Sequence, residues 1–98
     1  MHLEPTYTLR LFAEFEGILR DYWAIARPSP RRRLTRMEIL MARVAARVNI
    51  PTDALAAADL VREHRNEIIH GGSGAQRLTF EASKAALATF ISFLPLRW

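Results

Sequence analysis

Hydrophobic residues recur at helical spacing in four segments of the chain. In the first, between residues 7 and 26, apolar side chains return every three or four positions, which is the period of one helix face. These apolar positions are Leu11, Phe12, Phe15, Ile18, Leu19, Tyr22 and Ile25. The segment "RPSPRRR" follows, and it ends the helix because proline cannot continue one.

A second helix is expected over residues 35–48. Thr35 is followed three residues later by Glu38, which is the spacing of a capping box. Six apolar positions are expected to face inward: Leu34, Met37, Leu40, Met41, Val44 and Val48.

The third and fourth helices are expected over residues 52–70 and 79–94. Thr52 is a suitable N-cap for the third helix, and Asp53 suits the positive end of its dipole. The glycine-rich "GGSG" stops that helix. The fourth opens near Thr79 and has apolar positions at Phe80, Leu87, Phe90, Ile91 and Leu94.

No segment alternates apolar and polar residues for long enough to predict a strand. The pattern therefore predicts an all-α fold, a four-helix antiparallel bundle in a single domain over residues 1–98. A chain of 98 residues buries only about two-thirds of its unfolded surface, so a partner would stabilise it.

The third helix contains one charge where its pattern calls for an apolar residue. At about 100° per residue, Ala58, Val61, Ile68 and Ile69 define an apolar arc, and Arg65 falls inside it. A guanidinium is rarely placed among core residues without a partner. Either Arg65 extends to the surface along its methylene stem, or it faces an interface that holds an anion.

Arg65 is followed by Asn66 and, at the last helical position, by His70. Taken alone, such a histidine is more often structural, since it suits the negative end of a helix dipole. The stretch "EHRNEIIHG", however, has the form Arg-polar-x-x-x-His at the end of the third of four helices. It resembles the hallmark motif of the HEPN superfamily of nucleotide-binding domains. "FAEFEGILR", with Glu16 and Arg20, resembles that family's opening helix less specifically.

The resemblance implies a metal-independent endoribonuclease without a cofactor, of the kind found in toxin–antitoxin and defence systems. It makes His70 the general base or acid and Arg65 the phosphate clamp, with Asn66 orienting one of them. Histidine titrates near neutral pH, and arginine offers fixed donors to phosphate oxygens. The RNA 2′-hydroxyl would attack the phosphorus and leave a 2′,3′-cyclic phosphate.

The spacing of the motif adds a geometric condition. Arg65 and His70 point about 140° apart on an ideal helix, so one straight helix does not aim both at one phosphate. Either the chain unwinds at Gly71 and Gly72, or a second copy completes a shared cleft, as in the homodimers of the family. Gly72 stands where one subfamily has a tyrosine that receives a nucleotide, so neutralisation by that route is not supported.

Two other functions stay open: a catalytically inactive module of the same type that binds RNA or a protein partner such as an antitoxin, and a helical interaction domain whose motif is coincidental. A metal site is disfavoured. Glu67 and His70 have the Glu-x-x-His spacing of di-iron bundles, but such sites need a second pair.

The formal charge of +4 makes an anionic partner plausible. Arg36, Arg43 and Arg47 form one stripe on the second helix, and Arg31, Arg32 and Arg33 precede it. The stripe is either an ordinary solvated face or a phosphate track that leads RNA to the motif.

The chain has no cysteine, no apolar run as long as a membrane span, and no signal-peptide pattern at its start. We therefore expect a cytoplasmic protein that does not enter a membrane.

Overall fold

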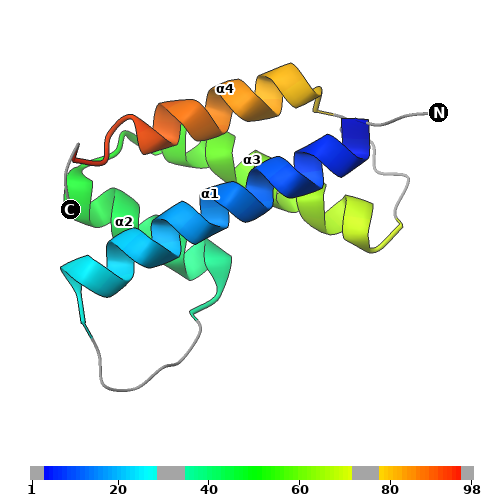
Figure 1. Cartoon of the computed structure of the whole chain (residues 1–98). Helices are drawn as coiled ribbons and strands as arrows, with labels where there is room; N and C mark the ends of the chain where they lie inside the picture. Colours follow the sequence, from blue (N-terminus) through cyan, green and yellow to red (C-terminus); the bar gives the residue numbers. More distant parts are fainter. Residues whose placement is uncertain (1–3, 29–34, 72–77, 96–98) are drawn as a thin grey trace.

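The computed structural model describes residues 4–28, 35–71 and 78–95, and these contain four α-helices. The helices are α1 (Glu4–Ala26), α2 (Met37–Val48), α3 (Thr52–Ile69) and α4 (Phe80–Ile91) (Figure 1). No strand occurs in these ranges. The all-α four-helix bundle expected from the sequence is confirmed.

The helices differ in their directions. A short turn joins α2 to α3, and Glu38 in the first turn of α2 lies 3.7 Å from Arg62 in the second half of α3, so these two helices are antiparallel. Tyr7 contacts Phe80 and Phe15 contacts Phe90, with ring centroids 6.0 and 5.4 Å apart. The earlier residue of α1 contacts the earlier residue of α4, and the later residue contacts the later one. The helices α1 and α4 therefore run in the same direction, opposite to α3 (Figure 1).

The core consists of apolar side chains from all four helices. Phe12, Phe15 and Phe90 are fully or nearly buried there, and Phe15 contacts Phe12 with tilted rings 5.5 Å apart and Phe90 edge to face. The other buried hydrophobic residues of the described helices are Leu19, Tyr22, Met37, Leu40, Met41, Val44, Ala45, Ala58, Val61 and Leu87. Most of the positions expected to face inward are therefore buried or partly buried; Leu34 lies outside the described residues.

Two of the expected N-caps are wrong. The helix α2 begins at Met37, its N-cap is Arg36, and no side chain caps it, so Thr35 and Glu38 form no capping box. Because α2 begins at Met37 and Arg36 occupies the N-cap position, Thr35 lies one position too early to cap. Pro51, rather than Thr52, is the N-cap of α3, because its φ of −59° and extended ψ already suit the position before a helix.

Thr79 does cap α4, as its Oγ1 accepts a hydrogen bond of 3.0 Å from the backbone N–H of Ala82. The helix ends at Ile91, three residues earlier than expected. Leu94 is nevertheless buried, because a tighter turn carries it back to the core through a 2.9 Å bond from its N–H to the carbonyl of Ile91.

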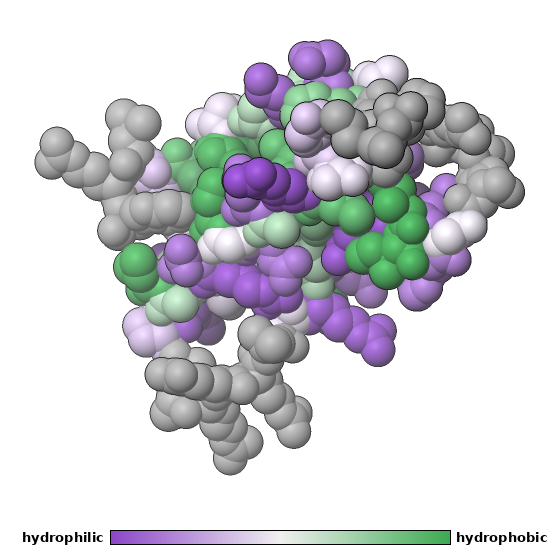
Figure 2. All heavy atoms as spheres, turned by 45° about the vertical axis from the view of Figure 1, so that its right-hand side comes forward, coloured by the Kyte–Doolittle hydropathy of each residue, from purple (hydrophilic) through white to green (hydrophobic). Residues whose placement is uncertain are grey.

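Two residues expected on apolar faces are exposed: Ile25 is 57% exposed and Ile69 is 56% exposed. Each lies in the last turn of its helix, where fewer neighbouring helices remain to cover it. On the face shown in Figure 2, hydrophobic residues form separate areas between hydrophilic ones.

Candidate functional site

The motif occupies the last turns of α3, and a glycine ends the helix there. His70 is the C-cap, and its backbone N–H donates to the carbonyl of Asn66 at 3.0 Å. Gly71 follows with φ at +68°, a left-handed conformation that side chains rarely adopt, and its N–H donates to the carbonyl of Ile68. The expected stop signal is confirmed at Gly71; Gly72 lies outside the described residues.

Arg65 lies where α3 packs on α1. Its guanidinium carbon is 4.7 Å from the centroid of the Phe12 ring, so the planar cation stacks on an aromatic side chain of α1. The residue is half-buried, and its Nε is buried without a hydrogen-bond partner. Its apolar neighbours Ala58 and Val61 are fully buried in this chain's own core. The two arrangements expected for Arg65, extension to the surface and an interface that holds an anion, both stay predictions.

Asn66 and His70 lie on another side of α3. On the helical wheel they share a face with Asp59 and Glu63, about 100–140° from Arg65. His70 is exposed and Asn66 is half-buried. The structure therefore brings Asn66 and His70 to one face and directs Arg65 away from them, so the motif does not form a single cluster within one chain.

A cluster around Arg62 was not expected from the sequence. The Arg62 Nε donates a 2.7 Å hydrogen bond to Asp59, and its Nη2 lies 3.7 Å from Glu38 and 4.0 Å from Glu63. The hydrogen bond to Asp59 raises the pKa of Arg62 above its ordinary value, against the opposing effect of burial. With its side chain only 15% exposed, Arg62 joins α2 to α3.

Among the described residues, three further side-chain polar atoms are buried without a hydrogen-bond partner: Oγ1 of Thr8, Nδ1 of His64 and Oγ of Ser83. Thr8 lies one helical turn before Phe12, and Ser83 lies in the first turn of α4, at the end of the bundle where Tyr7 meets Phe80. The sequence carried a signal for the buried Thr8 alone, because this residue is in register with the apolar face of α1.

Glu16 and Arg20, the residues of the first helix that resemble the family's opening helix, form an ion pair. Arg20 Nε donates a 2.8 Å hydrogen bond to Glu16 Oε2, one turn earlier on α1. This is the ordinary i, i+4 ion pair of a helix surface, and each side chain is about 30% exposed or less.

The basic stripe is exposed along its whole length, as Arg36, Arg43 and Arg47 all face solvent. Because α2 and α3 are antiparallel, the start of α2 lies beside the second half of α3. Of the three arginines, Arg36 is therefore the nearest to Arg62 and to the motif along the helix axis. Arg43 and Arg47 lie farther along α2, toward the beginning of α3 and away from His70. The stripe therefore approaches the motif only at its Arg36 end.

Charge is divided unevenly along the chain. All ten acidic residues belong to the described ranges, whereas five of the fourteen basic residues, Arg31, Arg32, Arg33, Arg77 and Arg97, do not. The described helices thus carry slightly more negative than positive charge, and the net charge of +4 comes from residues outside them.

Within the described ranges, no three histidine or acidic side chains gather in a way that could hold a metal ion. None of the helices in the described ranges is long and apolar enough to cross a membrane. Comparisons with known protein families, with curated proteins and with solved structures find no match to this chain.

Proposed function

We propose that this protein is an endoribonuclease of HEPN type, which cleaves RNA without a metal ion through Arg65, Asn66 and His70. The observation that carries the proposal is the contrast between two arginines three residues apart. Arg62 is surrounded by three carboxylates, whereas Arg65 has a buried Nε without a partner. A guanidinium that lies on an aromatic ring and pairs with no carboxylate of the described residues is suited to attract an anion.

In the proposed reaction, the 2′-hydroxyl of RNA loses its proton to a base and attacks the adjacent phosphorus. The bond to the 5′-oxygen breaks, and a proton is returned to that oxygen. His70 is exposed at the helix end, so its imidazole can reach a bound RNA and exchange the proton. Arg65 stabilises the added negative charge on the phosphate. The products are a 2′,3′-cyclic phosphate and a 5′-hydroxyl.

The separation of Arg65 and His70 requires a second element. A single α3 directs them to different sides, so a shared site needs either local unwinding after Ile69 or a second copy of the chain. The resemblance favours the second copy, and the proposed active form is a homodimer. A place in a cytoplasmic toxin–antitoxin or defence system, with an antitoxin as a possible partner, rests on the resemblance alone.

The same separation favours one alternative, a catalytically inactive module of this type that binds RNA or a protein partner. In that case Arg65 would serve the core through its contact with Phe12, and His70 would only end the helix.

The test is cleavage of mixed RNA by the purified protein in the presence of EDTA. We expect fragments that end in a 2′,3′-cyclic phosphate and that disappear with His70→Ala, while His64→Asn, a control on the same helix, retains cleavage if it stays folded. Loss of the positioned base should reduce the rate about 10²–10⁴-fold. RNA binding without cleavage by the parent protein would favour the inactive module, and cleavage by His70→Ala would exclude the proposed role of the histidine.

A further inference from the structure

One face of the molecule combines basic side chains with a tryptophan, where α2 packs beside the second half of α1. Two contacts with α3 fix how these helices are aligned. Glu38 in the first turn of α2 lies beside Arg62, and Phe12 of α1 contacts Arg65, about one turn later on α3. The start of α2 is therefore level with the middle of α1, and both helices run opposite to α3 (Figure 1).

The helix α1 contributes Arg20, Trp23 and Arg27, which are three or four residues apart and so share one side of the helix. Trp23 is half-buried and packs against the core, which leaves part of its indole open to solvent. The backbone N–H of Arg27 donates to the carbonyl of Trp23 at 2.8 Å. This hydrogen bond holds Arg27 in helical register just after the end of α1.

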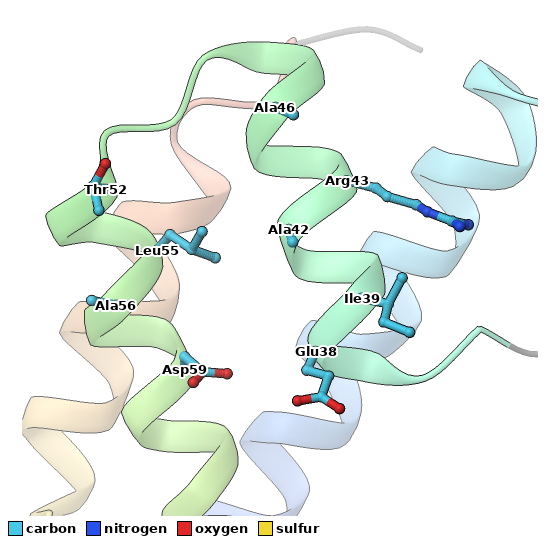
Figure 3. A pocket seen from close by; sticks show the side chains of 9 residues that line it. All are labelled: Glu38, Ile39, Ala42, Arg43, Ala46, Thr52, Leu55, Ala56 and Asp59. Carbon is cyan, nitrogen blue, oxygen red and sulfur yellow. The ribbon is translucent and has the colours of Figure 1, made fainter.

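The helix α2 contributes Arg43 and Arg47, one turn apart. Figure 3 shows the Arg43 side chain extending toward α1 and away from α3. Counted along the two helices from Glu38, Arg43 and Arg47 are about level with Arg20 and Trp23. The arginines of the two helices therefore lie on both sides of the tryptophan.

Most of the positive charge of this face is not compensated. Glu16, on the same side of α1, is paired with Arg20 at 2.8 Å. Arg27, Arg43 and Arg47 are exposed, and they form no ion pair with another residue that the structure describes. Three cations without a counter-charge thus lie around a partly open aromatic side chain.

We propose that this face, made of Arg20, Trp23, Arg27, Arg43 and Arg47, binds single-stranded RNA. The arginines contact phosphates, and Trp23 stacks on a base. A base can stack on a protein side chain only when it has left the stack of a duplex, so Trp23 selects single strands. A track of arginines alone would hold single strands and duplexes alike, because both present phosphates.

The face is separate from the proposed cleavage site. Because Arg65 contacts Phe12, His70 is about level with the first turns of α1, and about 24 Å along the bundle separate it from Trp23 at 1.5 Å per residue. The face therefore holds the substrate at a distance from the reaction. The inference rests on the proposed function for the choice of RNA, and it adds the class of RNA and the surface that selects it.

The first measurement uses the fluorescence of Trp23. Trp98, the other tryptophan, lies outside the described residues, and Trp98→Phe leaves Trp23 as the single fluorescent indole. His70→Ala in the same chain keeps the RNA intact. An unstructured RNA strand of about 12 nucleotides, within the usual range of site sizes, should quench this fluorescence as it binds, because a stacked base contacts the indole. No binding, or binding seen by anisotropy without quenching, would overturn the inference.

Substitutions at Trp23 test the stacking. Trp23→Leu should weaken binding of the strand about 5- to 150-fold, which is the effect of losing one stacked base. Trp23→Phe keeps an aromatic ring and should keep most of the affinity, while circular dichroism checks that both variants retain their helices. An affinity of Trp23→Leu equal to that of the parent, or a duplex bound as tightly as the single strand, would contradict the role of Trp23.

Two arginines of α1 provide a matched comparison. Arg27→Gln should reduce the slope of log affinity against log salt concentration by about 0.7, the value of one phosphate contact. Arg10→Gln removes an exposed arginine from the other half of α1 and should leave the slope unchanged. Equal effects of the two variants would mean that the charge acts without regard to place, against the proposed face.

RNA cleavage by the parent separates the two proposals. Quenching of Trp23 without cleavage would support the face and favour the inactive module. Cleavage without quenching would overturn this inference and leave the proposed nuclease standing. Equal affinity for single-stranded DNA would support the face and overturn the choice of RNA.

Discussion

At the scale of single residues, the two arginines of α3 show how the same side chain serves different purposes. Arg62 is neutralised by carboxylates from α2 and α3, so it contributes to the fold. Arg65 stacks on Phe12, which stabilises a cation by about 0.5–2 kcal/mol. The Nε of Arg65, however, is buried without a hydrogen-bond partner, which destabilises the folded state by about 1–3 kcal/mol. The two contributions nearly cancel, so stability alone does not explain an arginine at this position.

Replacement of Arg65 by methionine should therefore change the free energy of unfolding by no more than about 1 kcal/mol, in either direction, because the loss of the ring contact is offset by removal of the unpaired donor. RNA cleavage should nevertheless be lost. Urea denaturation and the cleavage assay on the same preparation measure both. A drop in stability of several kcal/mol would mean that Arg65 is a structural residue.

Arg62→Met is the matched comparison and should behave in the opposite way. It leaves Asp59 without its 2.7 Å hydrogen bond and places three carboxylates together without a counter-charge. The free energy of unfolding should fall by about 1–3 kcal/mol. An Arg62→Met protein as stable as the parent would show that the cluster contributes nothing to joining α2 and α3.

At the scale of helices, the number and approximate positions of the elements could be predicted from apolar periodicity, and most inward positions were identified correctly. The first residues of the helices were harder to predict. Thr35 and Thr52 are residue types that favour the N-cap, but Arg36 and Pro51 occupy the N-cap positions of α2 and α3. The partner of Arg65 could not be predicted either, because Phe12 lies far away in the sequence and meets Arg65 only through packing of α1 on α3.

The cap assignments lead to a prediction for three threonines. Thr79→Ala should lower the free energy of unfolding by about 1 kcal/mol, since it removes the acceptor for the Ala82 N–H at the start of α4. Thr35→Ala and Thr52→Ala should each change it by less than about 0.5 kcal/mol, because neither side chain caps a helix. Thermal or urea unfolding of the three variants measures the difference. Equal losses at all three positions would contradict the assigned caps.

At the scale of the whole molecule, the arrangement of charge decides how RNA could be held. The described helices carry little net charge, and on α2 the exposed arginines lead away from His70 as the helix proceeds. If Arg36, Arg43 and Arg47 contact phosphates, the logarithm of RNA affinity should fall with the logarithm of salt concentration by about 0.7 per contact.

Replacing all three with glutamine should then reduce that slope by about two units, while the helical content stays the same. Fluorescence anisotropy of a labelled RNA over a series of salt concentrations gives the slope. An unchanged slope would show that the stripe is only a solvated face.

The parallel arrangement of α1 and α4 has a consequence for how the chain reaches this fold. The ring contacts Tyr7–Phe80 and Phe15–Phe90 join residues about 75 positions apart, so the loop between them must close before the central aromatic layer forms. Contacts this distant in sequence slow folding relative to bundles built from neighbouring helices. On the ribosome, the part of the aromatic face of α1 that α4 covers stays exposed until α4 has emerged, and throughout that time it is open to misassociation with other nascent chains.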